Sequence, residues 1–473
     1  MKNLLFVTLL LGIQLSLSAQ RNQQSACDSV CGLVKRYING KNTNALYDLT
    51  GETFKGILSD SAFRSILEQN LFPLGEIRET TFESSSDGVS KYKTKFVSVV
   101  LELLLGLDRV GKIETFQFEP YTDGNTKKNI TVLSSNHLIS SLDKEIDSLV
   151  KPYMTRLAAT GLSIGVLWSG RRFFYGYGET AKGSNQIPDE NTIYEIGSIS
   201  KTFTAVLLAD AAISGKVSLD DPINKYLPDT IPNLEYDGIP IKLLTLSNHS
   251  SGIPGIPVNL NITDAKNPYK DYDNRRLFSF YVHFKPGRKP GEKYEYSNLA
   301  VGTLGVILER VYKENYESLL IERICLPLGM YDTRQFIRNN DSSRFAKGYD
   351  ANGYYNPPWD FKAMAGAGAI RSTTSDLLKY ANANLGDAPV LLGKAMLLTH
   401  QVTFSNGPKV GLAWHLIKPG HDEIIFHNGG TGGYRSYLSI NKERNFAIVI
   451  LTNTAIGTEE IGDTLMKWLE SYP

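Results

Sequence analysis

Two patterns of apolar and polar residues follow one another in the first quarter of the chain. From residue 30 to residue 71, apolar side chains recur at intervals of three and four, which predicts amphipathic helices. From residue 91 to residue 121 the chain reads KYKTKFVSVVLELLLGLDRVGKIETFQFEPY, which predicts two or more strands around a turn at Asp108 to Gly111. We therefore expect a small α+β domain over residues 22–130.

Strand-like segments at both ends of the remaining chain enclose a longer, mostly helical region. A predicted helix over residues 137–157 is followed by a hairpin over residues 161–179, and a second hairpin covers residues 434–453. Strands from both ends fit one antiparallel sheet, with the middle of the chain folded over it. We expect this second domain to cover residues 137–473, after a linker at residues 131–136.

The first twenty residues, MKNLLFVTLLLGIQLSLSAQ, combine Lys2, an apolar run and a small-residue exit at Ser18-Ala19. This arrangement is typical of a secretory signal peptide, and we expect cleavage after Ala19. The apolar run is too short to span about 30 Å of hydrocarbon. We expect a soluble periplasmic or secreted protein without a stable membrane anchor. Fifty basic and 49 acidic side chains give no overall preference for nucleic acid.

Cysteine and histidine residues leave one question open and give no support to a metal site. Cys27 and Cys31 are four residues apart in a predicted helix, so they share one face and form either a local disulfide or two half-buried thiols. The seven histidines include no pair at a spacing typical of metal ligands. We assign His415 and His421 to structural roles, and we expect neither a metal nor an organic cofactor.

The stretch EIGSISKTFTA, residues 195–205, places Ser198 three residues before Lys201 at the start of a predicted helix. This helix is apolar nearly all round, which indicates that it is buried. The N-terminus of a buried helix favours a developing negative charge. An amine that burial keeps neutral can take the proton of a serine hydroxyl. The other interpretation is an ordinary N-cap serine followed by a first-turn lysine.

The spacing Ser-x-x-Lys occurs elsewhere in the chain, so spacing alone does not identify a nucleophile. Two copies lie in the helix of residues 137–157 and one at the turn of the last hairpin, where lysine most simply faces water. GLSIG at residues 161–165 matches the G-x-S-x-G pattern of α/β-hydrolases, but a helix precedes Ser163 and a strand follows it. The nucleophile elbow needs the reverse order, so we assign Ser163 to a strand.

Two further segments carry polar residues beside glycines or small residues. Tyr296 and Asn298 follow a Pro-Gly turn and precede LAVGTLG, which begins a predicted helix. His427, Gly429 and Gly430 lie in FHNGGTGGYRSYLSI, where one strand ends before the next begins. The glycine runs GGTGG and GAGAI lack the Lys-Ser/Thr of phosphate loops, so close packing of strands explains them better.

In this order, Ser-x-x-Lys, Tyr-x-Asn and a His-x-Gly strand resemble the class C β-lactamase and D-peptidase family of penicillin-recognising serine hydrolases. The similarity extends to EIGSISKTFTAVLLADAAISGKVSLDDPINKYLP, LLTLSNHSSGIPG and GAGAIRSTTSDLLKYA, and it covers about residues 140–473. It implies an α+β, β-lactamase/transpeptidase-like fold with a mostly helical insert between about residues 218 and 345.

The resemblance implies roles for particular side chains. Ser198 would be the acylated nucleophile and Lys201 its partner in proton transfer. Tyr296 would be the general base or a proton shuttle, with its phenolate favoured by Lys201, and the family pattern leaves open which of the two takes the first proton. Asn298 would hold Lys201 and contact a substrate amide.

The resemblance also implies an oxyanion hole from the N–H groups of Ser198 and Gly430, with His427 and Gly429 lining the third side of the site. Many β-lactamases of this type have a lysine where this chain has His427, and a neutral imidazole recognises the carboxylate of β-lactams more weakly. We therefore expect a D-amino-acid peptidase or esterase acting on small-molecule or peptide substrates, including peptidoglycan-derived ones. The alternative is a non-catalytic peptidoglycan- or partner-binding protein on the same fold.

The order and size of the first domain are similar to those of cone-shaped domains of the nuclear-transport-factor-like superfamily. This resemblance rests on layout and on no motif. Such cones bind ligands or mediate dimers, and a packing or spacer domain is the other interpretation.

Overall fold

The computed structural model describes residues 24–58, 60–86, 88–121, 132–156 and 158–472. The chain divides into two compact units, Met1–Asn129 and Ile130–Pro473. The expected signal peptide, residues 1–19, lies outside the described residues. Within the described part of the chain, every helix is too short or too polar to cross a bilayer.

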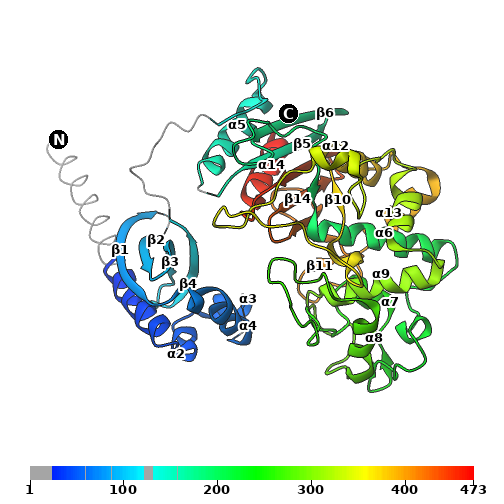
Figure 1. The fold of residues 1–473 in the computed structure, drawn as a ribbon, viewed down its shortest axis with the longest axis horizontal. Coiled ribbons are helices and arrows are strands. Elements are labelled where there is room, and N and C mark those ends of the chain that lie inside the picture. Colours follow the sequence, from blue (N-terminus) through cyan, green and yellow to red (C-terminus); the bar gives the residue numbers. More distant parts are fainter. Residues whose placement is uncertain (1–23, 59, 87, 122–131, 157, 473) are drawn as a thin grey trace, which may run out of the picture. The chain divides into compact units, whose positions relative to one another are not determined.

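The first unit places helices before a four-stranded antiparallel meander, and its strands are neighbours in chain order (Figure 1). Asp108 closes the turn between the last two strands, because its carboxylate accepts hydrogen bonds from the N–H groups of Val110 and Lys112. The helices cover residues 24–39, α2 Thr43–Asp48, α3 Glu52–Ile57 and α4 Asp60–Ile66, and the strands are β1 Ile77–Ser86, β2 Val89–Phe96, β3 Val100–Leu107 and β4 Ile113–Pro120.

Cys27 and Cys31 are both buried in the core of the first unit, and both are free thiols. The Cys27 thiol donates to the carbonyl oxygen of Leu105 at 3.9 Å. Burial raises the pKa of the Cys31 thiol to about 11, so this thiol stays protonated at neutral pH. Of the two interpretations that the sequence left open, the structure therefore shows two buried thiols.

The second unit is built on a seven-stranded antiparallel sheet that combines both ends of the domain, as the sequence pattern predicted (Figure 1). The C-terminal strand β15 pairs with β5, the first strand of this unit, so the two ends meet in the middle of the sheet. The strand order is β11 Lys409–Val410, β12 His415–Ile417, β13 Ile424–Gly430, β14 Arg435–Asn441, β15 Phe446–Thr452, β5 Gly161–Trp168 and β6 Arg171–Gly178.

Alternate side chains of β15 enter two separate cores, one on each face of the sheet. Ile448 and Ile450 pack in the core that includes residues of α5 (Ser141–Met154) and α14 (Glu459–Ser471). Val449 and Leu451 pack in the larger core on the other face. A strand buried on both faces reads as an unbroken apolar run, which explains the sequence FAIVILT.

The larger core holds the elements that surround the candidate nucleophile. Within it, α6 contacts α9, α11 and α13, and α12 contacts β5 and β15. The insert between residues 218 and 345 was expected to be mostly helical, but helices cover fewer than half of its residues; turns and loops make up most of the remainder, with one short hairpin, β8 Glu235–Tyr236 and β9 Ile239–Pro240. The α-helices between α5 and α14 in this unit are α6 Ser200–Ile213, α7 Leu243–Ser247, α8 Asn274–His283, α9 Asn298–Tyr312, α10 Tyr316–Leu320, α11 Ala365–Gly368, α12 Thr374–Asn384 and α13 Val390–Thr399.

The described part of the expected linker, residues 132–136, runs along the edge strand β6. The N–H of Gly178 donates to the carbonyl oxygen of Leu133 at 2.8 Å, and the N–H of Ser135 donates to Gly176 at 3.0 Å. These bonds satisfy edge groups of β6 that would otherwise need water. This segment therefore packs as part of the second unit, a role that its polar composition did not indicate.

Truncation of Ile450 tests the sheet-centred core. Ile450→Ala removes buried methyl groups between β15 and the helices, so we expect the free energy of unfolding of this unit to fall by about 2–5 kcal/mol. Val258→Ala is the control, because Val258 is 90 % exposed, and it should change that free energy by less than about 0.5 kcal/mol. Urea unfolding measures both values, and equal effects of the two substitutions would contradict the assignment.

Candidate active site

Ser198 lies in a single 3₁₀ turn, Gly197–Ile199, directly before the buried helix α6. The turn follows the short strand β7 (Tyr194–Glu195). Gly197 has a φ of +48°, and a Cβ there would lie 2.5 Å from the backbone nitrogen of Gly430. Only glycine fits this close approach, so the turn and the end of β13 are held in direct backbone contact.

The amine of Lys201 lies one helical turn below Ser198 and is completely buried. Its Nζ lies 3.0 Å from the Ser198 hydroxyl oxygen, 2.8 Å from Asn298 Oδ1 and 2.8 Å from the carbonyl oxygen of Ala367. Asn298 begins α9 and Ala367 lies in α11. Three segments far apart in the sequence thus converge on one nitrogen.

Burial lowers the pKa of Lys201 well below its ordinary value. The three neighbours fit a neutral amine, which has two N–H donors and one lone pair. The amide oxygens of Asn298 and Ala367 only accept hydrogen bonds, whereas the Ser198 hydroxyl can also donate. The lone pair of the amine therefore faces the hydroxyl of Ser198. The arrangement can remove a proton from that hydroxyl.

Tyr296 lies two residues before the start of α9, and its ring centroid is 4.8 Å from Lys201 Nζ. Burial raises the pKa of Tyr296, and a hydrogen bond with the Ser198 side chain opposes this increase only in part. Tyr296 is therefore a protonated phenol at neutral pH. These pKa directions give no support to the expected Tyr296 phenolate, because the neighbouring Lys201 amine is neutral and supplies no positive charge.

Alternation along β13 directs His427 and Gly429 to the side of the sheet that carries Ser198. A Cβ at Gly429 would lie 2.1 Å from the carbonyl oxygen of Ile196 and 2.8 Å from the nitrogen of Ser198. Asn428 faces the other way, and its side-chain amide donates to Glu459 at the start of α14. The structure thus brings the predicted site residues of β13 against the turn that carries Ser198.

His427 is buried and neutral. Burial lowers its pKa well below the ordinary value. Its Nδ1 lies 2.6 Å from the carbonyl oxygen of Asn428, which can only accept, so Nδ1 carries the ring proton. The Nε2 atom is then a hydrogen-bond acceptor, and it is buried without a partner among the described residues. His427 therefore supplies neither a cation nor a free donor.

Sequence reasoning did not place in the site three residues that lie against it. Ala367 supplies a carbonyl oxygen to Lys201, and His249 lies against the ring of Tyr296 with 4.4 Å between ring centroids. His415, which was assigned a structural role, lies 5.4 Å from the ring of His427. The only signal for Ala367 and His249 was their position in two family-like segments, GAGAIRS and LSNHSSGIPG.

The rival serines occupy different surroundings. Ser163 lies in β5, as expected, and its hydroxyl lies 2.9 Å from the Tyr194 hydroxyl. None of the described hydrogen bonds of the Ser163 side chain involves a lysine. The Ser148 hydroxyl donates to the carbonyl oxygen of Glu145, and Lys151 pairs with Asp147 at 2.7 Å. The Lys151 side chain is 56 % exposed, whereas Lys201 is fully buried.

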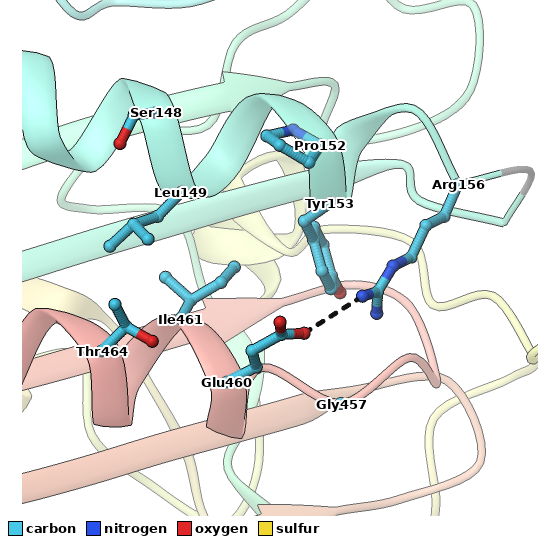
Figure 2. Close-up of a pocket in the computed structure, with 9 residues that line it drawn as sticks. All are labelled: Ser148, Leu149, Pro152, Tyr153, Arg156, Gly457, Glu460, Ile461 and Thr464. Atoms are coloured by element: carbon cyan, nitrogen blue, oxygen red, sulfur yellow. Dashed lines mark hydrogen bonds and ion pairs between the residues drawn. The ribbon is translucent and has the colours of Figure 1, made fainter. Parts of the chain in front are cut away.

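Two cavities differ in chemistry. The cavity beside Ser198 has an aromatic wall made by Tyr269, Trp359 and Phe361. A cavity of about 170 Å³ lies between α5 and α14, where Figure 2 shows Arg156 and Glu460 pointing toward one another. They form an ion pair 3.4 Å long. The lining of this second cavity contains no pairing of a serine with a neutral amine, so we place the candidate site at Ser198.

The fold and this arrangement of Ser198, Lys201 and Tyr296 define the class of β-lactamase-related serine hydrolases. A family model described as Beta-lactamase matches residues 146–468, and the chain belongs to this family. The predicted fold class and the prediction of a serine hydrolase are thereby confirmed.

Two similar proteins are a β-lactamase and a D-alanyl-D-alanine-carboxypeptidase/endopeptidase. The chain is 29 % identical over 342 residues to a β-lactamase of Pseudomonas fluorescens, covering 65 % of this chain and 92 % of the relative. It is 28 % identical over 316 residues to the D-alanyl-D-alanine-carboxypeptidase/endopeptidase AmpH of Escherichia coli, covering 63 % and 80 %.

Two similar solved structures are named for the same two kinds of enzyme. A β-lactamase/D-alanine carboxypeptidase from Pseudomonas syringae superposes with a TM-score of 0.62 at 25 % identity, covering 71 % of this chain and all of that one. The D-alanine carboxypeptidase AmpC from Burkholderia cenocepacia superposes with a TM-score of 0.61 at 25 % identity, covering 70 % and 99 %. The similarity to the cone-shaped superfamily, suggested for the first unit, stays a prediction.

Substitution of Gly429 tests the close approach of β13 to the Ser198 turn. Gly429→Ala places a methyl group against backbone atoms, so the two segments must separate, and we expect a loss of about 1–3 kcal/mol in the free energy of unfolding. Gly287→Ala is the matched control, because its Cβ would meet nothing within 4 Å. Thermal and urea unfolding measure the effect. A Gly429→Ala variant as stable as Gly287→Ala would contradict the described contact.

Proposed function

We propose that the protein hydrolyses peptide, amide or ester bonds through an acyl-enzyme on Ser198, and that D-amino-acid peptides or esters are better substrates than β-lactams. The observation that carries this proposal is the Lys201 amine, which is fully buried and lies 3.0 Å from the Ser198 hydroxyl oxygen, with a pKa that burial lowers well below its ordinary value. Ser198 itself is only half-buried, so a substrate can reach it, whereas Lys201 is buried away from water. The serine hydrolase family of the chain fits this chemistry.

In the acylation step, the proton of the Ser198 hydroxyl passes to the lone pair of Lys201 while the serine oxygen bonds to the substrate carbonyl carbon. The carbonyl electron pair moves onto its oxygen. We assign the N–H groups of Ser198 and Gly430 to the stabilisation of this oxyanion. The close backbone contacts at Gly197 and Gly429, which bring these two N–H groups near one another, support the assignment.

Proton delivery to the leaving group is assigned to Tyr296. Its phenol is protonated, it interacts with the Ser198 side chain, and its ring lies beside the Lys201 amine. When the tetrahedral intermediate collapses, Tyr296 gives its proton to the departing nitrogen or oxygen and is reprotonated from Lys201. Water then hydrolyses the serine ester by the same proton transfers, with the Ser198 oxygen as the leaving group. Of the two candidate first bases, the pKa directions favour Lys201, and Asn298 holds it in place.

His427 favours substrates that place an uncharged group at the third side of the site. A β-lactam carries a carboxylate, which needs a cation or donors, whereas the Nε2 atom of His427 is an acceptor. Among the relatives, AmpH of Escherichia coli is named a D-alanyl-D-alanine-carboxypeptidase/endopeptidase. A peptidoglycan-derived D-peptide is therefore a candidate substrate. Export through the predicted signal peptide, residues 1–19, would bring the enzyme to such substrates.

Intact-mass spectrometry tests the acyl-enzyme. The purified protein is incubated with a fluorophosphonate and, separately, with a penicillin. We expect a stoichiometric mass increase with the fluorophosphonate that vanishes in Ser198→Ala and persists in Ser163→Ala, the matched control at the serine of the G-x-S-x-G pattern. Labelling by penicillin should be slower, by a factor of about 10 or more for one lost charge-assisted contact.

Absence of labelling in a folded parent protein would contradict the proposal and favour a non-catalytic binding protein. Penicillin labelling as fast as that of the fluorophosphonate would contradict the substrate preference and leave the nucleophile assignment intact. Labelling that persists in Ser198→Ala would place the nucleophile elsewhere.

A further inference from the structure

His249 is a fully buried histidine with an uncommon backbone conformation. It follows α7 and has a φ of +60°, in the left-handed region that residues other than glycine and asparagine seldom adopt. Strain of this kind persists only where surrounding contacts require it. The contacts of His249 are therefore informative.

His249 accepts hydrogen bonds from the two residues that flank Tyr296 in the sequence. The carbonyl oxygen of His249 accepts the N–H of Glu295 at 2.7 Å. Its Nδ1 atom accepts the N–H of Ser297 at 3.1 Å. The residues immediately before and after Tyr296 are thus both held by one residue.

The imidazole also contacts the side chain of Tyr296. The two ring centroids are 4.4 Å apart with an interplanar angle of 33°. The Lys201 amine also lies 4.8 Å from the centroid of the Tyr296 ring. The Tyr296 ring therefore has both an imidazole and an amine beside it, and the backbone N–H groups of both its chain neighbours are held by His249.

The hydrogen bond from Ser297 also determines the tautomer of His249. Because Nδ1 accepts an N–H, it carries no proton, and the proton of the neutral ring is on Nε2. Burial lowers the pKa of His249 well below its ordinary value. A neutral ring adds no positive charge beside Lys201, so the contact does not disturb the Ser198 base.

We propose that His249 is a positioning residue that holds the Tyr296 phenol in line with Ser198 and Lys201 through the two backbone hydrogen bonds and the ring contact. This inference rests on the proposed function, because it concerns the proton delivery assigned to Tyr296. His249 touches neither the nucleophile nor its base by any described hydrogen bond, so its effect is exerted through Tyr296.

Two substitutions that both tolerate a left-handed backbone separate the hydrogen bond from the strain. His249→Asn keeps an acceptor, because Oδ1 of asparagine occupies nearly the place of Nδ1, whereas His249→Gly removes it. Hydrolysis of ethyl acetate, whose ethoxide leaving group must be protonated, is followed by pH-stat titration and gives kcat and KM, with circular dichroism and thermal unfolding as the check on folding. We expect His249→Gly to lower kcat by about 30-fold or more with KM changed by less than about 3-fold, since a displaced proton donor affects the reaction and not binding.

His249→Asn should recover kcat to within about 5-fold of the parent protein. A merely structural role would reduce stability and the active fraction in both variants without this recovery. Equal kcat losses in the two variants, or a His249→Gly variant with parental kcat, would overturn the inference. If His249→Gly does not fold, the asparagine variant alone decides, and a folded His249→Asn with kcat reduced more than about 10-fold would contradict the proposal.

The parent protein and Ser198→Ala make the two proposals separable. Hydrolysis by the parent that is lost in Ser198→Ala supports the proposed function before His249 is considered. A parent without esterase activity and without fluorophosphonate labelling contradicts the proposed function itself. An active parent with unaltered His249 variants contradicts only the positioning role.

Discussion

The buried amine of Lys201 is the interaction on which the rest of the site depends. Its partners are two amide oxygens and one hydroxyl, from three segments of the chain. Burial lowers the pKa of Lys201 in the folded state below its unfolded value. The unfolded chain therefore binds a proton more readily, and the resulting loss of stability grows as pH falls from the unfolded pKa toward the folded one. The two-sided core around β15 provides the stability that offsets this cost.

Much of the fold and the central pair of the site were predictable from sequence. The strands at both ends of the second domain are apolar runs between clear turns, and Ser198 lies in the turn that leads into the apolar helix of Lys201, so local patterns define them. The contribution of Ala367 could not be predicted, because it is a backbone carbonyl whose direction depends on how α11 packs against α6. The attachment of residues 132–136 to β6 was missed for the same reason, since backbone pairing leaves no trace in a polar sequence.

His249 and His427 show why residue type alone does not determine electrostatics in this site. Both imidazoles are buried and neutral, yet their protons are on opposite nitrogens. A backbone carbonyl fixes the proton of His427 on Nδ1, and a backbone N–H fixes that of His249 on Nε2. The Nε2 atom of His427 is therefore an acceptor, and that of His249 is a donor. These assignments depend on neighbouring backbone groups within a few ångströms, which the spacing of histidines along the chain does not reveal.

The central claim is that Lys201 is a neutral amine at the pH at which the enzyme acts. Two-dimensional NMR of protein labelled with ¹³Cε-lysine measures this directly, with Lys201 assigned by the resonance that disappears in Lys201→Met. The account predicts that this resonance has the chemical shift of a neutral amine at pH 7, while exposed lysines titrate near their ordinary pKa of about 10.4. A Lys201 resonance that titrates together with the exposed lysines would contradict the account.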